Sequence, residues 1–150
     1  LQKLLERHPK AKLKILCGEK PNWNIPFEHT PWSKGAEASF LEGVDVGVMP
    51  MPENDPFSLG KSPIKALHYM AMGLPVVGHM NVGGACDIAQ RGGCISVKNK
   101  EDFIAALEKL MDTDFYNSQS QAALANARKN HDQRVVFERM VALWSGRELH

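Results

Sequence analysis

The sequence lacks the marks of a disulfide framework, a metal cluster or a membrane span. Its three cysteines, Cys17, Cys86 and Cys94, are an odd number, lie far apart and include no C-x-x-C pair, which argues against disulfides and against a zinc site. Buried thiols in a reducing cytoplasm are the simpler interpretation, so we expect a cytoplasmic protein. No run of about 18 apolar residues and no charged segment before a shorter apolar one is present, so we expect neither a transmembrane helix nor a signal peptide.

The sequence also has little net charge. Lys and Arg number 18 against 17 Asp and Glu, which leaves a formal net charge of +1. Bulk electrostatics therefore favours neither nucleic acid nor an anionic membrane as a partner, and any anion site has to be local. A chain of 150 residues is long enough for a single domain with a sizeable core. The opening residues LQKLLERHP look like a helix entered partway, which predicts a piece of a longer protein.

Short apolar segments alternate with helical patterns along the chain. Strands are predicted at LKILCGE, VDVGVMPMP, LPVVGHM and CISV, with a weaker one at NIPFEHTPW. A helix is predicted from Ser62-Pro63 to Gly73, with Ser62 as its cap and Pro63 as its first residue. Further helices are predicted at the first residues, in GAEASFLEG behind a Ser33 cap, in GACDIAQRGG, in KEDFIAALEKLMD, and in two pieces between about Phe115 and Trp144 that join near Asn130. This alternation predicts a doubly wound parallel α/β sheet, Rossmann-like, with a helical C-terminal tail. Ligands of such sheets bind beyond the carboxyl ends of the strands.

Positive charge collects at the start of one predicted helix, in GKSPIKALHYM. A helix start already carries partial positive charge and N–H groups without partners, so lysines there weaken folding unless an anion binds nearby. The N–H groups of Ile64 and Lys65, the Ser62 hydroxyl and the Lys61 ammonium together suit a diphosphate. Four residues separate the two lysines, which predicts neighbouring positions on the first turn. The alternative is that both lysines are solvated and that Ser-Pro is a cap and nothing more.

Other polar residues near this helix are weaker signals. The segment is no P-loop, because Asp55 stands where the G-x-x-x-x-G-K-[ST] spacing requires its first glycine. His68 is placed to reach the hydroxyls of a bound ligand, although a lone helical histidine is more often a packed or capping group. Glu53, Asp55 and Glu28 invite a carboxylate-pair interpretation, but loop acids are usually solvated. A second loop, HMNVGGACD, allows close backbone approach at its two glycines, although Gly-Gly alone usually marks a turn.

The segment VDVGVMPMPENDPFSLGKSPIKALHYMAMGLPVVGHMNVGGACDI resembles the C-terminal, nucleotide-sugar-binding domain of retaining glycosyltransferases of the group 1, or family 4, type, which have the GT-B fold. That family has the pattern Asp-Val-x-Val-x-Pro, an acidic and glycine-containing loop, Glu-Ala-Met-Ala-x-Gly-x-Pro-Val-Val, then Gly-Gly-x-x-Glu-Ile. The positions in register here are Asp45, Pro50, Met70-Ala71, Gly73, Pro75-Val76-Val77, Gly83-Gly84 and Asp87-Ile88. The strand LKILCGE, the helix leading to Asp45, and KEDFIAALEKLM are similar to further elements of the family.

The resemblance implies a transferase of hexosyltransferase type that passes a sugar from a nucleoside diphosphate to an acceptor hydroxyl, with no metal ion or other cofactor. It implies residues 1–150 as one donor-binding domain, a preceding acceptor domain that is missing here, and an isolated piece that binds without turnover. The acceptor would be a sugar, a glycan or a lipid-linked acceptor, with peripheral membrane association of the full-length protein left open. Donor-binding residues would be Gly18, Asn54, Gly60, Ser62, Ile64, His68, Gly83 and Gly84, and catalytic residues Glu53, Lys61 and Lys65.

The sequence departs from the family pattern at two positions. Members commonly carry two glutamates eight residues apart, and Gly60 and His68 occupy those positions here. A subgroup with lysines at the positions of Lys61 and Lys65 and a glutamine in place of the second glutamate is the nearest match, and His68 would then bond the ribose as that amide does. Pro63 replaces a glycine and removes one N–H donor. Two other interpretations stay open: a non-catalytic scaffolding subunit that has lost the carboxylates, and a nucleotide-sugar epimerase.

Overall fold

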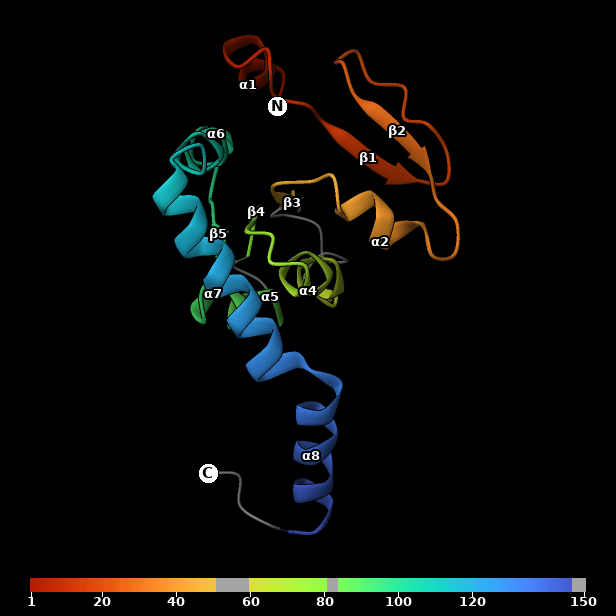
Figure 1. The fold of residues 1–150 in the computed structure, drawn as a ribbon, viewed down its shortest axis with the longest axis vertical. Helices are drawn as coiled ribbons and strands as arrows, with labels where there is room; N and C mark the ends of the chain where they lie inside the picture. The colour runs from red at the N-terminus through yellow and green to blue at the C-terminus, as the bar shows by residue number, and fades with distance from the viewer. Residues whose placement is uncertain (51–59, 81–83, 147–150) are drawn as a thin grey trace. The chain divides into compact units, whose positions relative to one another are not determined.

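The computed structural model describes residues 1–50, 60–80 and 84–146 of the chain (Figure 1). It divides the chain into two compact units, Leu1–Asp45 and Val46–His150, and each is described by itself below. The predicted single domain over residues 1–150 stays a prediction.

The first unit is built around two short parallel strands. Its elements are α1 (Gln2–Arg7), β1 (Lys14–Cys17), β2 (Glu28–Pro31) and α2 (Ala36–Leu41). The register runs from Lys14 opposite Glu28 to Cys17 opposite Pro31, and the Trp32 N–H donates to the Cys17 carbonyl (2.9 Å) beyond the last pair. An exposed ion pair between Lys12 and Glu28, 2.9 Å apart, lies beside the start of β2. This pairing places Glu28 in a surface contact; Glu53 and Asp55, which were considered with it from sequence, lie outside the described residues.

The start of α2 differs from the sequence prediction. Gly35, with φ of +89°, is the N-cap, and no side chain makes a capping hydrogen bond. Ser33 contributes its carbonyl, which accepts from the Ala36 N–H (3.1 Å), so the predicted Ser33 side-chain cap is wrong. The chain turns at a left-handed glycine, a conformation that glycine adopts without steric cost.

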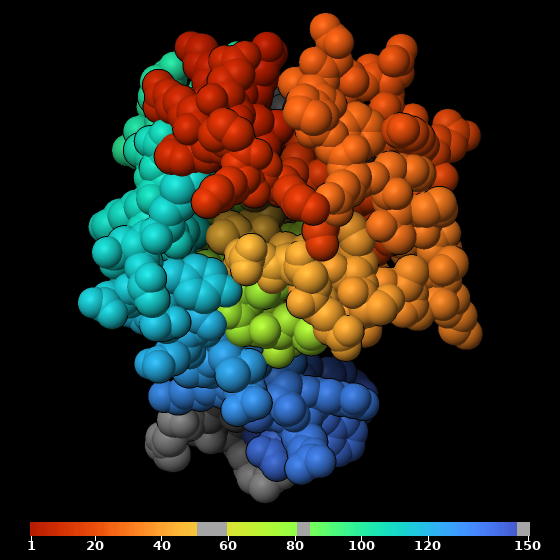
Figure 2. All heavy atoms as spheres, turned by 45° about the horizontal axis from the view of Figure 1, so that its top comes forward, coloured from red at the N-terminus to blue at the C-terminus, as the bar shows by residue number. Residues whose placement is uncertain are grey.

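The second unit has a three-stranded parallel sheet in the order β3–β4–β5. Its strands are β3 (Gly47–Met49), β4 (Val76–Gly78) and β5 (Cys94–Ser96), and its helices are α4 (Ile64–Ala71), α5 (Gly84–Gln90), α6 (Lys100–Lys109), α7 (Thr113–His131) and α8 (Gln133–Trp144). Helix α4 packs against β3, β4 and α7, α5 against β5, and α6 against β4. Figure 2 shows part of α4, in yellow-green, beside the blue residues of α7. The predicted two-piece helical tail is confirmed, with its break at Asp132.

The core of the second unit gathers the apolar residues of the sheet and the helices around it. Its most deeply buried large side chains are Met70, Val76, Val77, Met80 and Ile88. Burial on both faces explains why β4 is apolar at every position rather than alternating. The α/β class with parallel strands is therefore confirmed, although the described strands form two small sheets. The alternation of strand and helix patterns along the sequence predicts which segments are strands. It does not predict which strands pair with one another.

A close contact between a glycine and a helix fixes the position of β5. Gly93 precedes β5 with φ of +81°, and a Cβ built on it would overlap the backbone of Ala123 on α7. Glycine is therefore required here for two reasons: the backbone is left-handed, and there is no room for a side chain. The contact lets α7 lie directly over the end of the sheet.

Candidate functional site

The site proposed from sequence lies at the amino end of α4. The first hydrogen bond of the helix runs from the Leu67 N–H to the Pro63 carbonyl (3.1 Å). The N–H groups of Ile64, Lys65 and Ala66 precede this bond and have no acceptor within the helix. Pro63 is the N-cap and makes no side-chain capping bond. Donors and the positive end of the helix dipole therefore face the segment that precedes α4.

Two sequence predictions about this helix start are wrong. Ser62 was expected to cap the helix with Pro63 as its first residue, but the structure places Pro63 at the cap and Ser62 outside it. A capping side chain has to sit at the N-cap to reach the N–H groups two and three residues on. Lys61 also precedes the helix, so the four-residue rule for neighbours on one helical turn does not apply to Lys61 and Lys65.

The side chains around this helix start face solvent. Gly60, Lys61, Ser62 and Lys65 are all exposed. Within α4, Ile64, Lys65 and His68 share one side because they are three and four residues apart, and all three are exposed. Ile64, which recurs with Leu67 and Met70 at helical spacing in the sequence, is 55% exposed. The structure thus brings a lysine, a histidine and the first helical N–H groups to one exposed side of α4.

The opposite face of α4 anchors the helix in the core. Ala66 and Met70 are completely buried, and Met70 Sδ lies 3.4 Å from Cys94 Sγ on β5. Burial raises the pKa of the Cys94 thiol to about 12, so it stays protonated at neutral pH. Because packing holds the buried face of α4 against the core, it also fixes the direction of the opposite, exposed face that carries Lys65 and His68.

Close backbone contacts bring β3 against α4 and β4. A Cβ on Gly47 would overlap the Tyr69 ring, and one on Gly78 would overlap the Met49 carbonyl. Gly73, with φ of +73°, follows α4 and returns the chain to β4, as predicted. Along the chain, β3 ends at Met49 and α4 begins at Ile64, which is the strand-then-helix order of α/β sheets whose ligands bind beyond the carboxyl ends of the strands.

Helix α5 is held by a buried amide that sequence reasoning missed. The Asn126 side chain is 4% exposed, and its Nδ2 donates to the carbonyls of Ile88 (3.1 Å) and Gly92 (3.0 Å) at the carboxyl end of α5. Asn130 in turn donates to Asn126 Oδ1 (3.1 Å). A signal was present in the sequence, because Asn126 stands between Ala123 and Ala127 in the buried stripe of α7.

The remaining predicted residues are placed as follows. Glu53, Asn54 and Gly83 lie outside the described residues, and Gly84 is the first residue of α5. Gly18 directly follows β1 in the first unit and has open space where a Cβ would be. Over residues 1–50, 60–80 and 84–146, no three His, Cys, Asp or Glu residues are grouped so as to hold a metal ion. The three cysteines are free thiols, as predicted.

The comparison with protein families decides the identity of the chain. A family model described as glycosyl transferases group 1 matches residues 3–113. The chain belongs to the group 1 glycosyltransferases. Searches of curated proteins and of solved structures found no match.

The family assignment agrees with the resemblance seen in the sequence. The match covers all of the first unit except its first two residues and includes α4, α5 and α6, while most of α7 and all of α8 follow it. Both loops singled out from sequence fall inside it. None of the helices described for this glycosyltransferase is both long and apolar enough to cross a membrane.

Proposed function

We propose that this glycosyltransferase chain binds the nucleoside-diphosphate sugar of a GT-B enzyme, with the diphosphate at the amino end of α4. The observation that supports it is the helix start itself. Three N–H groups precede the first helical bond at Pro63, and exposed lysines lie just before and within the first turn. Helix dipole, donors and cations then act on the same small volume, an arrangement suited to phosphate.

The same groups would assist departure of the sugar. Negative charge builds on the leaving diphosphate in the transition state, so donors already aimed at it lower the barrier. Lys61 and Lys65 are the candidates for that electrostatic role. In retaining transfer to an acceptor hydroxyl, the acceptor attacks from the face that the diphosphate leaves, without a protein nucleophile and without a metal ion. Glu53 and Asn54 are candidates for orienting the sugar, and His68 for bonding the ribose.

A titration of the protein with UDP, GDP and ADP tests this proposal. Thermal shift or calorimetry should show stabilisation by one nucleoside diphosphate, and Lys61→Ala and Lys65→Ala should each weaken its binding several-fold. Lys100→Ala is the matched control, because Lys100 is the first residue of α6 and is also exposed. Equal losses in all three variants would indicate a general charge effect and not a site.

The scaffolding alternative is tested by the same titration on the full-length protein. Gly60 and His68 replace the two family glutamates, which is the observation in favour of a subunit without transfer activity. Nucleotide binding that depends on Lys61 and Lys65 would contradict it. Failure to bind any nucleoside diphosphate in the presence of the acceptor domain would instead support it.

A further inference from the structure

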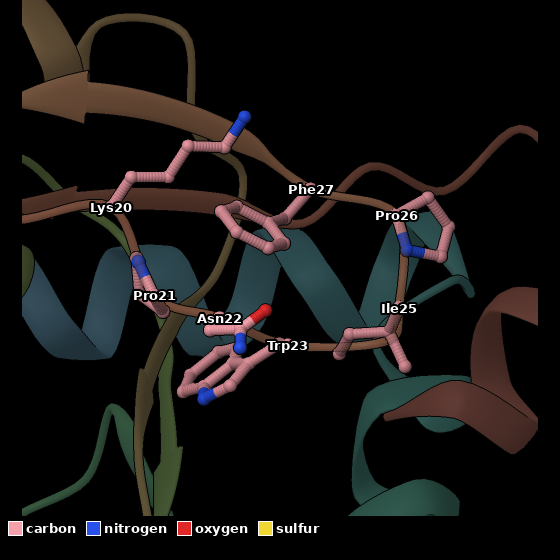
Figure 3. A pocket seen from close by; sticks show the side chains of 7 residues that line it. All are labelled: Lys20, Pro21, Asn22, Trp23, Ile25, Pro26 and Phe27. Carbon is pink, nitrogen blue, oxygen red and sulfur yellow. The ribbon is translucent and has the colours of Figure 1, made fainter.

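The loop between β1 and β2 forms a pocket that the proposed donor site does not use. The pocket has a volume of about 470 Å³ and is lined by residues 20–23 and 25–27 (Figure 3). That volume is within the range of pockets that take small ligands. All of its lining belongs to the first unit, whereas the proposed diphosphate site lies at residues 60–68.

Aromatic side chains form two walls of this pocket. The rings of Trp23 and Phe27 have centroids 5.9 Å apart and an interplanar angle of 66°. Each ring therefore limits the movement of the other, as expected for an edge-to-face pair. Trp23 is nevertheless 53% exposed, so much of its indole surface is open to a ligand. A large aromatic side chain that is held in place yet exposed suits a binding wall.

The charge in this pocket has a single sign. Lys20 Nζ lies 5.8 Å from the centroid of the Phe27 ring, and the lining contains no acidic residue. The Asn22 amide supplies both a donor and an acceptor. A negatively charged or neutral ligand with hydroxyl groups is therefore favoured over a cationic one.

The shape of the walls favours a puckered ring over a flat one. Two aromatic rings at 66° leave no parallel slot for a planar base between them, and Pro21, Ile25 and Pro26 add aliphatic surface around them. A pyranose ring presents C–H groups on its faces and hydroxyl groups at its edge, which matches apolar walls with an amide and an ammonium beside them. We propose that this loop binds a pyranose carrying a carboxylate, a uronic acid residue of a glycan, with Trp23 against the ring and Lys20 paired with the carboxylate.

Titration with methyl glucuronoside, methyl glucoside and methyl glucosaminide tests the proposal. Binding would be followed by saturation-transfer NMR and by tryptophan fluorescence. The acidic sugar should bind saturably and most tightly, and Trp23→Ala should weaken it roughly tenfold, the loss expected for one apolar ring contact. Lys20→Gln should weaken it about two- to fivefold, to the level of the neutral sugar, as expected for an exposed charge pair.

Two further variants serve as controls for the loss of sugar binding expected in Trp23→Ala. Trp32→Ala is the control, because Trp32 is 58% exposed in the same unit and outside the pocket lining, and it should bind as the unchanged protein does. Trp23→Phe should retain part of the affinity, which excludes unfolding as the cause of the loss in Trp23→Ala. The proposal is overturned by absent saturable binding, by equal binding of all three sugars, by loss of binding in Trp32→Ala, or by displacement of the acidic sugar by UDP or GDP. The first three outcomes do not bear on the diphosphate site, which the titration with nucleoside diphosphates tests separately.

Discussion

Replacing Asn126 with alanine should be among the most damaging single changes in the second unit. The change removes two hydrogen bonds to the carbonyls of Ile88 and Gly92 and one accepted from Asn130. Asn126 is 4% exposed. Without it the Gly92 carbonyl loses its side-chain donor, while the Ile88 carbonyl still accepts from the Arg91 N–H (3.2 Å). The carboxyl end of α5 would lose its two bonds to Asn126 and keep the bond from the Arg91 guanidinium to Asn130 Oδ1 on α7 (2.8 Å).

The size of the effect follows from these contacts. Each of the three lost hydrogen bonds contributes about 0.5–1.5 kcal/mol to the free energy of unfolding. Alanine recovers about 0.6 kcal/mol through its higher helix propensity. We therefore expect the free energy of unfolding to fall by about 1–4 kcal/mol, measured by urea denaturation followed by circular dichroism.

Two further variants make this prediction refutable. Asn117→Ala, an exposed position on the same helix, should change the free energy of unfolding by less than about 0.5 kcal/mol. Asn126→Asp keeps the shape but places carboxylate oxygens against two carbonyls, so it should destabilise more at neutral pH than in mild acid, where a protonated carboxyl can donate. If Asn126→Ala lost less than about 1 kcal/mol, the bonds to α5 would not contribute as the geometry indicates.

Three other predictions concern the same scaffold. Gly93→Ala should lower the free energy of unfolding by about 3 kcal/mol or more, because the residue has positive φ and its Cβ would overlap the Ala123 backbone; Gly18→Ala, with open space around it, is the control in the same denaturation experiment. His131 has a buried Nε2 without a hydrogen-bond partner in the described part of the chain, and burial, with Arg91 and Arg139 nearby, lowers its pKa below the usual 6.5. The unfolded chain therefore binds more protons, so stability should fall as pH drops below about 6.5; a His131→Gln variant with an unchanged pH slope would contradict this assignment. Asn99 caps α6 by accepting from the Asp102 N–H (2.8 Å), so Asn99→Ala should lose about 1 kcal/mol, and a thermal midpoint equal to that of the unchanged protein would refute the cap.

Local sequence patterns were enough to predict the elements and the family. Gly73 ends α4, the apolar run at Val76 and Val77 forms a buried strand, and the tail forms two helices. These features depend on residues close together in the chain, such as a left-handed glycine, an apolar run or a helical period. The spacing of Asp45, Gly73 and Pro75 likewise identified the group 1 family, which the family model confirms.

The candidate site was predicted in part. The sequence correctly located a helix start next to Lys61 and Lys65, but it assigned the cap to Ser62, whereas Pro63 is the N-cap. The error shifts the helix start by one residue, and a proline is compatible with either the N-cap or the first helical position. The face of α4 that turns inward is decided by Met70 against Cys94, a contact between segments far apart in the chain.

The sequence by itself determined which segments are helices and strands and which family they belong to, because those properties arise from neighbouring residues. Tertiary structure alone decided three further features: the outward side of α4 with Lys65 and His68, the support of α5 by Asn126, and the pocket of the β1–β2 loop. Each depends on contacts or loop geometry that sequence spacing leaves open. An amide in a helical stripe or a tryptophan in a loop acquires its role from what packing places beside it.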